Sequence, residues 1–281
     1  MTTATGIGVT RRDVLVAGGT LAGYAIAADP VLAQAIKTDT QGITAGDHEV
    51  KIGGYAMPVY EAKPSQGKGQ PVVLVISEIW GAHEYVKDTA RRFAKEGFHA
   101  VAPELFKREG GVAHIPNIQE ILKIVLAVPR EQVLDDCKAA VDWAKGRGGA
   151  RAAGVTGFCW GGGVTIQVAA TNPDVKAAVA WYGPFSGPFQ SKAGPVTGFD
   201  VAKDLKIPFL GLYGETDKNP APDDAKKFGE MLKQHGNKNV EIVVYPGAGH
   251  AFHADYRPSF NKAAAEDGWK RCVAWFKKHL A

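Results

Sequence analysis

The sequence predicts an α/β domain whose mainly parallel central sheet is covered by helices on both faces. Two observations support this fold class. Short runs rich in Val, Ile and Leu alternate with longer amphipathic segments, an order typical of parallel sheets, whose strands need crossover connections. Residues 71–76 also form a continuous apolar run, the pattern of a strand buried on both faces. In such sheets the active site lies at the carboxyl ends of the strands, so functional residues are expected in the strand-to-helix loops.

The elements are expected in a regular order. After the strand at 71–76, a helix is predicted over 83–96 that ends before Gly97, followed by a strand at 98–102. The remaining strands are expected at 153–157, 176–181, 209–213 and 240–245, and the remaining helices at 130–145, 162–170, 223–235 and 259–279. The less regular stretch from 49 to 63 is expected to supply antiparallel strands at the start of the sheet.

Two of these helices have a clear apolar face. In the helix at 130–145, the apolar positions at helical spacing are Val133, Cys137, Ala140, Val141 and Ala144. In the C-terminal helix, one side is shared by Trp269, Cys272, Trp275 and Phe276. Cys137 and Cys272 are therefore expected to fill the core rather than to react.

Composition and charge exclude several classes of protein. The chain has 281 residues, 45% hydrophobic and 22% charged, which fits a globular enzyme and not a disordered, collagen-like or coiled-coil chain. Its net charge of +4 comes without a long basic run, so no nucleic-acid partner is expected. No apolar run reaches the roughly 18 residues of a stable membrane span. The three cysteines have no CxxC spacing, and we expect neither a metal nor a cofactor.

Residues 1–35 are predicted to be an export signal rather than part of the domain. Arg11 and Arg12 directly precede an uncharged, weakly hydrophobic stretch, and Ala33-Gln34-Ala35 has the small-residue spacing that a signal peptidase accepts. This combination resembles a twin-arginine signal. The alternative is an N-terminal helix packed on the domain, but the glycines of the stretch would make it a poor helix in water. The sequence thus predicts a bacterial protein of the periplasm or the cell exterior, with a domain over 36–281.

The strongest motif is Gly157-Phe158-Cys159-Trp160-Gly161, which follows a predicted strand and opens a predicted helix. It has the form of a nucleophile elbow, G-x-nucleophile-x-G, with cysteine as the nucleophile. Gly157 and Gly161 remove side chains that would collide across so sharp a turn. The N–H groups at the start of the helix favour a thiolate at Cys159. A phosphate-binding loop, the alternative, would need another glycine spacing.

A base and an orienting carboxylate are expected downstream, in the order nucleophile, acid, histidine. Asp217 follows the predicted strand at 209–213, and His250 follows the one at 240–245. Both therefore lie at the same sheet edge as Cys159. His250 would accept the thiol proton, and Asp217, expected as an exposed loop carboxylate, would fix the orientation of the imidazole.

Other residues compete for these roles. Glu215, Asp223 and Asp224 are alternatives to Asp217, and His253 is an alternative to His250. The position of Asp217 just beyond a strand, and the Gly-x-Gly-His turn before His250, favour the first choice in each case. His250, His253 and Asp255 could also be read as metal ligands, but no H-x-x-x-H helix or matching cysteine accompanies them.

Together, four motifs resemble those of the dienelactone hydrolase (carboxymethylenebutenolidase) family. They are Ser77-Glu78-Ile79-Trp80-Gly81 after the first buried strand, the cysteine elbow, Gly-x-x-Asp ending at Asp217, and Gly-His-x-Phe around His250. The resemblance extends from about Glu49 to the C-terminus. It implies the α/β-hydrolase fold, a triad of Cys159, His250 and Asp217, and hydrolysis of a lactone.

The resemblance also implies three further roles near the nucleophile. Glu78 would accept a hydrogen bond from the resting thiol and be displaced when substrate binds. The backbone N–H groups of Ile79 and Trp160 would form the oxyanion hole, which agrees with the general geometry of the fold.

The sequence departs from the family pattern where the substrate carboxylate would bind. Enzymes that act on dienelactone hold it with two arginines, one of them four residues beyond the catalytic histidine. Here that position is Ala254, and the nearest arginine is Arg257. The stretch expected to hold the other, 116–123, contains only Lys123, which cannot copy a bidentate guanidinium. The hydrolase chemistry is therefore expected, and dienelactone itself is not assured as the substrate.

The sequence predicts an enzyme, a carboxylic ester hydrolase that cleaves lactones or activated esters through an acyl-enzyme thioester. A broad esterase or thioesterase on the same scaffold is one alternative. A catalytically silent periplasmic binding protein is another, which a missing triad residue would have favoured. The expected partner is a small lactone or ester, and a monomer is expected.

Overall fold

The computed structural model describes residues 36–148, 152–187 and 189–281. The strands in these ranges are β1 (Ile43–Ile52), β2 (Tyr55–Pro64), β3 (Val72–Ile76), β4 (His99–Pro103), β5 (Ala153–Phe158), β6 (Val175–Trp181), β7 (Phe209–Gly214) and β8 (Val240–Tyr245). The helices are α2 (Glu84–Lys95), the 3-10 turn η1 (Lys107–Glu109), α3 (Ile118–Ala127), α4 (Arg130–Gly148), α5 (Trp160–Thr171), α6 (Pro222–Gln234) and α7 (Lys262–His279). The predicted export signal, 1–35, lies outside the described residues.

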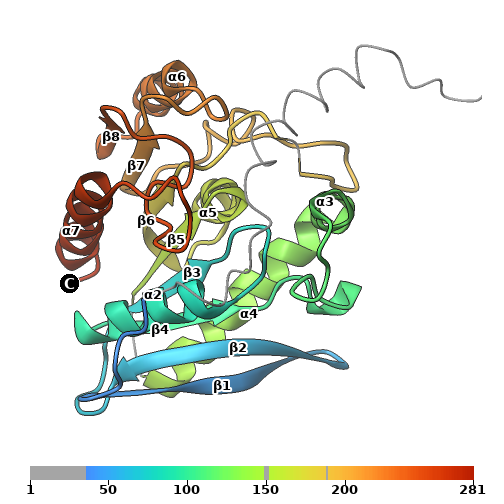
Figure 1. Ribbon diagram of the computed structural model, residues 1–281, viewed down its shortest axis with the longest axis vertical. Coiled ribbons are helices and arrows are strands. Elements are labelled where there is room, and N and C mark those ends of the chain that lie inside the picture. Colours follow the sequence, from blue (N-terminus) through green and yellow to red (C-terminus); the bar gives the residue numbers. More distant parts are fainter. Residues whose placement is uncertain (1–35, 149–151, 188) are drawn as a thin grey trace, which may run out of the picture.

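The strands form one sheet in the order β1-β2-β4-β3-β5-β6-β7-β8 (Figure 1). From β4 to β8 every neighbouring pair is parallel, whereas β1 and β2 form an antiparallel hairpin that joins the sheet through β4. The mainly parallel sheet and its antiparallel start are confirmed. The carboxyl ends of β5, β7 and β8 consequently share one edge.

Helices cover both faces of the sheet. A Cβ atom added at Gly154 of β5 would meet Phe276 of α7, whereas one added at Gly157, of opposite parity on the strand, would meet the start of α5. α7 and α5 therefore lie on opposite faces. α2 packs beside α7, with the ring of Phe93 4.6 Å from that of Trp269. Because both faces are covered, every residue of β3, β4, β5 and β7 is buried.

The two cysteines expected in the core lie there. Cys137 of α4 and Cys272 of α7 both have 0% exposed surface. Burial raises the pKa of both thiols well above its usual range, because a thiolate would lose its hydration. Neither thiol is therefore poised to react at neutral pH.

One helix was not predicted from the sequence. α3 begins after Asn117, whose side-chain oxygen accepts a hydrogen bond from the N–H of Gln119 at 2.8 Å. Its apolar residues Ile121, Leu122 and Val125 are buried against the domain. The predicted start of α5 at residue 162 was also late, because the helix begins at Trp160, inside the elbow motif.

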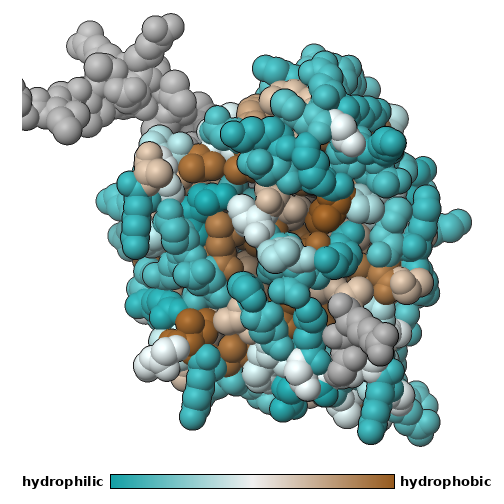
Figure 2. Space-filling model, turned by 180° about the vertical axis from the view of Figure 1, so that it is seen from behind, coloured by the Kyte–Doolittle hydropathy of each residue, from teal (hydrophilic) through white to brown (hydrophobic). Residues whose placement is uncertain are grey.

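The outer surface is largely polar. Figure 2 shows one face of the molecule covered mainly by hydrophilic side chains, with apolar groups in small patches near its centre. In the parts of the chain that the structure describes, no helix combines the length and apolar character needed to cross a membrane.

Candidate active site

Cys159 lies in a sharp turn between β5 and α5. Its backbone has φ 56° and ψ −122°, a region that non-glycine residues rarely adopt. A Cβ atom at Gly157 would lie 2.2 Å from the carbonyl oxygen of Gly161, and one at Gly161 would lie 2.4 Å from that of Ser77. The turn therefore requires glycine at both positions. The Cys159 residue itself is 1% exposed.

His250 and Asp217 meet on two neighbouring loops at this edge. The loop after β7 is joined to the loop after β8, because the N–H and hydroxyl of Thr216 donate to the carbonyl of Ala248 at 2.9 and 3.0 Å. Asp217 Oδ2 consequently lies 2.8 Å from His250 Nδ1. The other oxygen, Oδ1, accepts the N–H of Asn219 at 2.9 Å. The carboxylate thus holds one nitrogen of the imidazole in place.

Asp217 is buried, with 4% of its surface exposed, so the expectation of an exposed loop carboxylate was wrong. The reason is the contact between the two loops, which sequence spacing does not reveal. A buried carboxylate is costly unless it is hydrogen-bonded, so the bonds from Asn219 and His250 stabilise Asp217 in this position.

The charge state of His250 depends on Cys159 as well as on Asp217. Burial disfavours the charged imidazolium, but the negative charge of Cys159 and the hydrogen bonds to Asp217 and Cys159 outweigh it and raise the pKa of His250 to about 10. The imidazole is therefore protonated at neutral pH when it faces a thiolate. An imidazolium beside a thiolate is the kind of ion pair that can activate a cysteine for attack.

The competing acids lie elsewhere. Glu215 accepts a hydrogen bond from the N–H of Gly247 at 2.9 Å and is exposed. Asp223 and Asp224 lie in the first turn of α6. Asp223 pairs with Lys226 of the same helix at 3.2 Å, so its carboxylate has a partner away from the triad.

His253, the competing base, belongs to a different environment. Its Nδ1 atom lies 2.6 Å from the hydroxyl of Tyr85, and burial together with Arg92 lowers its pKa to about 3. Asp255 pairs with Arg92 at 2.7 Å. These two residues therefore do not join His250 as ligands, and the described ranges contain no cluster of three His, Cys, Asp or Glu that could hold a metal ion.

The loop after β3 lies against the elbow. The carbonyls of Ile76 and Ser77 face Gly161 closely, which brings Ile79 to the nucleophile side of the sheet. Glu104 fixes the loop, because its carboxylate accepts the N–H of Ala82 at 2.7 Å and that of Phe106 at 3.3 Å. Trp160 is the first residue of α5, where a backbone N–H has no acceptor within the helix.

Glu78 is fully buried, and its partners are on the loop after β8. The hydroxyl of Tyr256 donates to Glu78 Oε2, and Arg257 Nη2 lies 4.0 Å from Oε1. In this structure the carboxylate thus faces Tyr256 and Arg257, while Cys159 interacts with His250. Burial opposes the charge of Arg257, but the negative charge of Glu78 outweighs this and raises the pKa of Arg257 above its usual range.

Sequence reasoning missed Tyr256, Arg257 and His83 as residues of the site. Arg257 was noted only as the arginine nearest to Ala254, but two consecutive turns return the loop to Glu78: the N–H of Ala254 bonds the carbonyl of Ala251, and that of Arg257 bonds the carbonyl of Ala254, both at 3.0 Å. His83 packs edge-on to Tyr256, and burial lowers its pKa to about 4, so it is neutral. For Tyr256 and Arg257, the signal in the sequence was the cluster of polar residues shortly after His250.

Comparison with known proteins identifies the family of this chain. The model of the dienelactone hydrolase family matches residues 57–280. A protein of Methylorubrum extorquens with the name "Putative carboxymethylenebutenolidase" is 46% identical over 272 residues, 95% of this chain and 93% of that protein. One of Escherichia coli K12 with the same name is 45% identical over 260 residues, 92% of this chain and 95% of that protein.

The fold agrees with that of a solved relative. A crystal structure from Klebsiella pneumoniae, described as that of a "Putative Dienelactone Hydrolase", has a TM-score of 0.79 and 44% identity and covers 84% of this chain and 99% of its own. The predicted α/β-hydrolase fold and the predicted family are thereby confirmed. The chain belongs to the dienelactone hydrolase family and is a carboxymethylenebutenolidase-like hydrolase of the carboxylic ester hydrolase class.

Proposed function

We propose that this protein hydrolyses lactones or activated carboxylic esters through a Cys159–His250–Asp217 triad. The observation that carries the proposal is the convergence of these three residues from the loops after β5, β8 and β7, with His250 linked to Asp217 at 2.8 Å and coupled to Cys159 by charge. A small-molecule lactone or ester fits this site, and the carboxymethylenebutenolidase names of the relatives point to the same substrate class.

In the acylation step, the Cys159 thiolate attacks the carbonyl carbon of the substrate. A carbon–sulfur bond forms, and the carbonyl electron pair moves to the oxygen, where the N–H groups of Ile79 and Trp160 would stabilise it. The carbonyl then re-forms and the carbon–oxygen bond of the ester breaks. His250 donates its proton to the departing oxygen, which in a lactone remains attached to the acyl chain.

In the deacylation step, water replaces the alcohol. The now neutral His250 accepts a proton from a water molecule as its oxygen attacks the thioester carbonyl. The carbon–sulfur bond breaks, the carboxylic acid leaves, and the thiolate–imidazolium pair is restored. Asp217 keeps the same imidazole nitrogen hydrogen-bonded through both steps.

The sulfur nucleophile limits which substrates can react. A thiolate is easily expelled from the tetrahedral intermediate, so the substrate must carry a leaving group that is at least as stable. Enolates released from enol-lactones and phenolates released from aryl esters meet this condition, and amines do not. The arginine at the site, Arg257, lies beside Trp80 and Glu78, which suits an acyl group with both apolar and anionic parts.

A hydrolysis screen tests the proposed function. We expect enol-lactones and aryl esters to be turned over with a kcat/KM at least about 10²-fold above that of the matched amides, because of the leaving-group limit. Turnover of simple p-nitrophenyl esters equal to that of enol-lactones would indicate a broad esterase. Absence of turnover across lactones, esters and thioesters would contradict the proposal and favour a binding protein.

Glu78 is proposed to control the reactivity of the thiol, because the charges of Glu78 and Cys159 both act on Arg257, and a carboxylate in the same site disfavours a second negative charge. Replacing Glu78 with glutamine should therefore speed alkylation of Cys159 by iodoacetamide at pH 7 several-fold. Mass spectrometry of the labelled peptides measures the rate, and the buried Cys137 and Cys272 serve as internal controls that should stay unlabelled. Equal rates with and without the carboxylate would remove this role and leave the triad unaffected.

We also infer that residues 1–35 direct export to the periplasm or the cell exterior by the twin-arginine pathway. Because that pathway reads the guanidinium pair, replacing Arg11 and Arg12 with lysine should leave the protein in the cytoplasm. Cell fractionation of the variant and the parent in a bacterial host measures this. Unchanged accumulation outside the cytoplasm would contradict the inference.

A further inference from the structure

The first described residues are firmly attached to the domain. The N–H of Thr38 donates to the carboxylate of Asp88 in α2, and Lys95 Nζ lies 2.6 Å from both Asp39 Oδ1 and the carbonyl of Gln41. These bonds begin two residues after Ile36, which itself follows the small-residue motif at Ala33–Ala35. The chain is therefore bonded to α2 close to the peptide bond that a signal peptidase would cleave.

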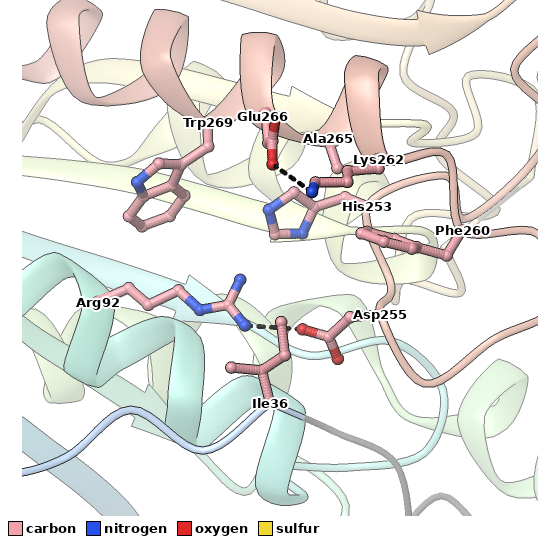
Figure 3. A pocket seen from close by; sticks show the side chains of 9 residues that line it. All are labelled: Ile36, Arg92, His253, Asp255, Phe260, Lys262, Ala265, Glu266 and Trp269. Carbon is pink, nitrogen blue, oxygen red and sulfur yellow. Dashed lines mark hydrogen bonds and ion pairs between the residues drawn. The ribbon is translucent and has the colours of Figure 1, made fainter.

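Ile36 lies at a cavity of about 380 Å³ between α2, the loop after β8 and α7 (Figure 3). Arg92 of α2, Asp255 and His253 of the loop, and Trp269 of α7 also line it. The ion pair of Arg92 and Asp255 lies directly beside Ile36 in this view. The cavity is distinct from the triad, because the described residues that line it include neither Cys159, His250 nor Asp217.

Asp255 is a buried carboxylate, and one of its two oxygens lies outside the ion pair with Arg92. Its side chain is 4% exposed, and Oδ2 is paired with Arg92 at 2.7 Å. Oδ1 is buried without a well-formed hydrogen bond among the described residues. Burial is the largest effect on the carboxyl group of Asp255 and raises its pKa above the usual range. Arg92 and the backbone N–H of Ile36 act in the opposite direction but do not cancel the effect of burial. A buried carboxylate in this state favours a further positive partner.

The nearby cations do not fill that role. Arg92 already divides its guanidinium between Asp255 and Asp88. Lys262 is 78% exposed and faces Glu266 at 3.8 Å on the rim of the cavity. His253 is buried and neutral, with its pKa lowered to about 3.

We propose that Asp255 is the docking site for the α-ammonium group of Ile36, created when the Ala35–Ile36 peptide bond is hydrolysed. Hydrolysis consumes one water, leaves a carboxylate on Ala35 and an amine on Ile36, and that amine takes up a proton at neutral pH. The ammonium offers a full charge and three donors where the uncleaved chain offers one amide N–H. This inference rests on the proposed processing of the export signal and not on the proposed reaction.

The docking would connect processing with the active-site loop. Asp255 directly precedes Tyr256 and Arg257, which hold Glu78, and lies five residues beyond His250. The loop is anchored beyond Asp255 by the N–H of Asn261, which bonds the carbonyl of Phe252 at 2.9 Å. A second anchor at Asp255 would restrain the segment that presents Tyr256 and Arg257 to Glu78.

Two proteins that differ only at the N-terminus test the proposal. The Klebsiella structure covers 84% of this chain and 99% of its own, so a related domain folds on a chain shorter than the full 281 residues, and a protein that begins at Ile36 is expected to fold. One protein begins at Ile36, released from a fusion partner by a protease that cleaves directly before it, and the other carries an added Gly-Ser. The Ile36 form should melt about 2–4 °C higher. Asp255→Asn should abolish the difference, and Glu266→Gln, a carboxylate on the same cavity, should preserve it.

Reactivity of the α-amine gives a second measurement that needs no substitution. The Ile36 amine should be methylated several-fold more slowly at pH 7 than the glycine amine of the extended protein, because docking keeps it protonated. Equal melting temperatures together with equal amine reactivity would overturn the proposal, as would a melting difference that persists in Asp255→Asn. Mass spectrometry of the exported protein tests the processing separately, since an N-terminus other than Ile36 would refute processing at this bond and not the ability of Asp255 to bind the amine.

Discussion

Replacing Cys159 with alanine should abolish hydrolysis of lactones and esters, a loss of at least about 10³-fold in kcat. In the proposed mechanism the thiol at the elbow is the group that forms the covalent bond to the acyl carbon, whereas Asp217 is occupied with the imidazole of His250. Without it, His250 and Asp217 could at most assist direct attack by water. The fold should persist, because the backbone of the turn is set by its glycines and alanine removes a single atom from a residue that is 1% exposed.

Three measurements separate loss of the nucleophile from a general defect. Mass spectrometry of the wild-type enzyme with a slow ester should detect an acyl adduct on Cys159, and the variant should form none. Cys137→Ala, which alters a core thiol of α4, should keep most of the activity. The pKa of His250, about 10 while the thiolate faces it, should fall in Cys159→Ala, because burial then acts without that opposing charge. Full activity in Cys159→Ala would end the covalent mechanism.

The parts of this molecule that were predicted correctly depend on local patterns. The central strands β3 and β5 are short, largely apolar runs, because a strand buried on both faces has no solvent-exposed side for charged residues. The elbow is equally local, since the clash at Gly157 and Gly161 comes from atoms a few residues away. Once the strands are parallel, their carboxyl ends share an edge, and this rule is enough to predict that Asp217 and His250 lie at the same edge of the sheet as Cys159.

The parts that were missed depend on contacts between distant segments. Asp217 is buried because the loop after β8 lies over it, a packing that its own neighbours in sequence do not encode. Tyr256 and Arg257 reach Glu78 across 178 and 179 positions of sequence through turns that bring the loop back. α3 is an exception, because it begins with an ordinary Asn cap and most of its residues are apolar, so its own sequence carried a helix signal that sequence reasoning did not use.

Asp217→Asn should lower kcat by about 10³- to 10⁴-fold while the enzyme stays folded. Asparagine can keep the hydrogen bond from Asn219, but its amide no longer carries the charge that stabilises the imidazolium. If its NH₂ group turns toward His250 Nδ1, it selects the tautomer in which Nε2 carries the proton and cannot accept one from Cys159. Because Asp217 is buried with two hydrogen bonds, we also expect a loss of about 1–3 kcal/mol in the free energy of unfolding.

The matched control is Glu215→Gln, which removes a carboxylate two residues away on the same loop. The Glu215 side chain is exposed, and within the described ranges its one hydrogen bond comes from the N–H of Gly247, so this variant should keep nearly normal kcat and stability. Steady-state kinetics on an aryl ester, with urea unfolding of each protein, distinguishes a catalytic defect from a folding defect. If Glu215→Gln lost activity and Asp217→Asn retained it, the orienting carboxylate would be Glu215. The 2.8 Å contact of Asp217 with His250 would then serve the structure and not catalysis. If His250 still works as the base after Asp217 has lost its charge, another group must orient its imidazole.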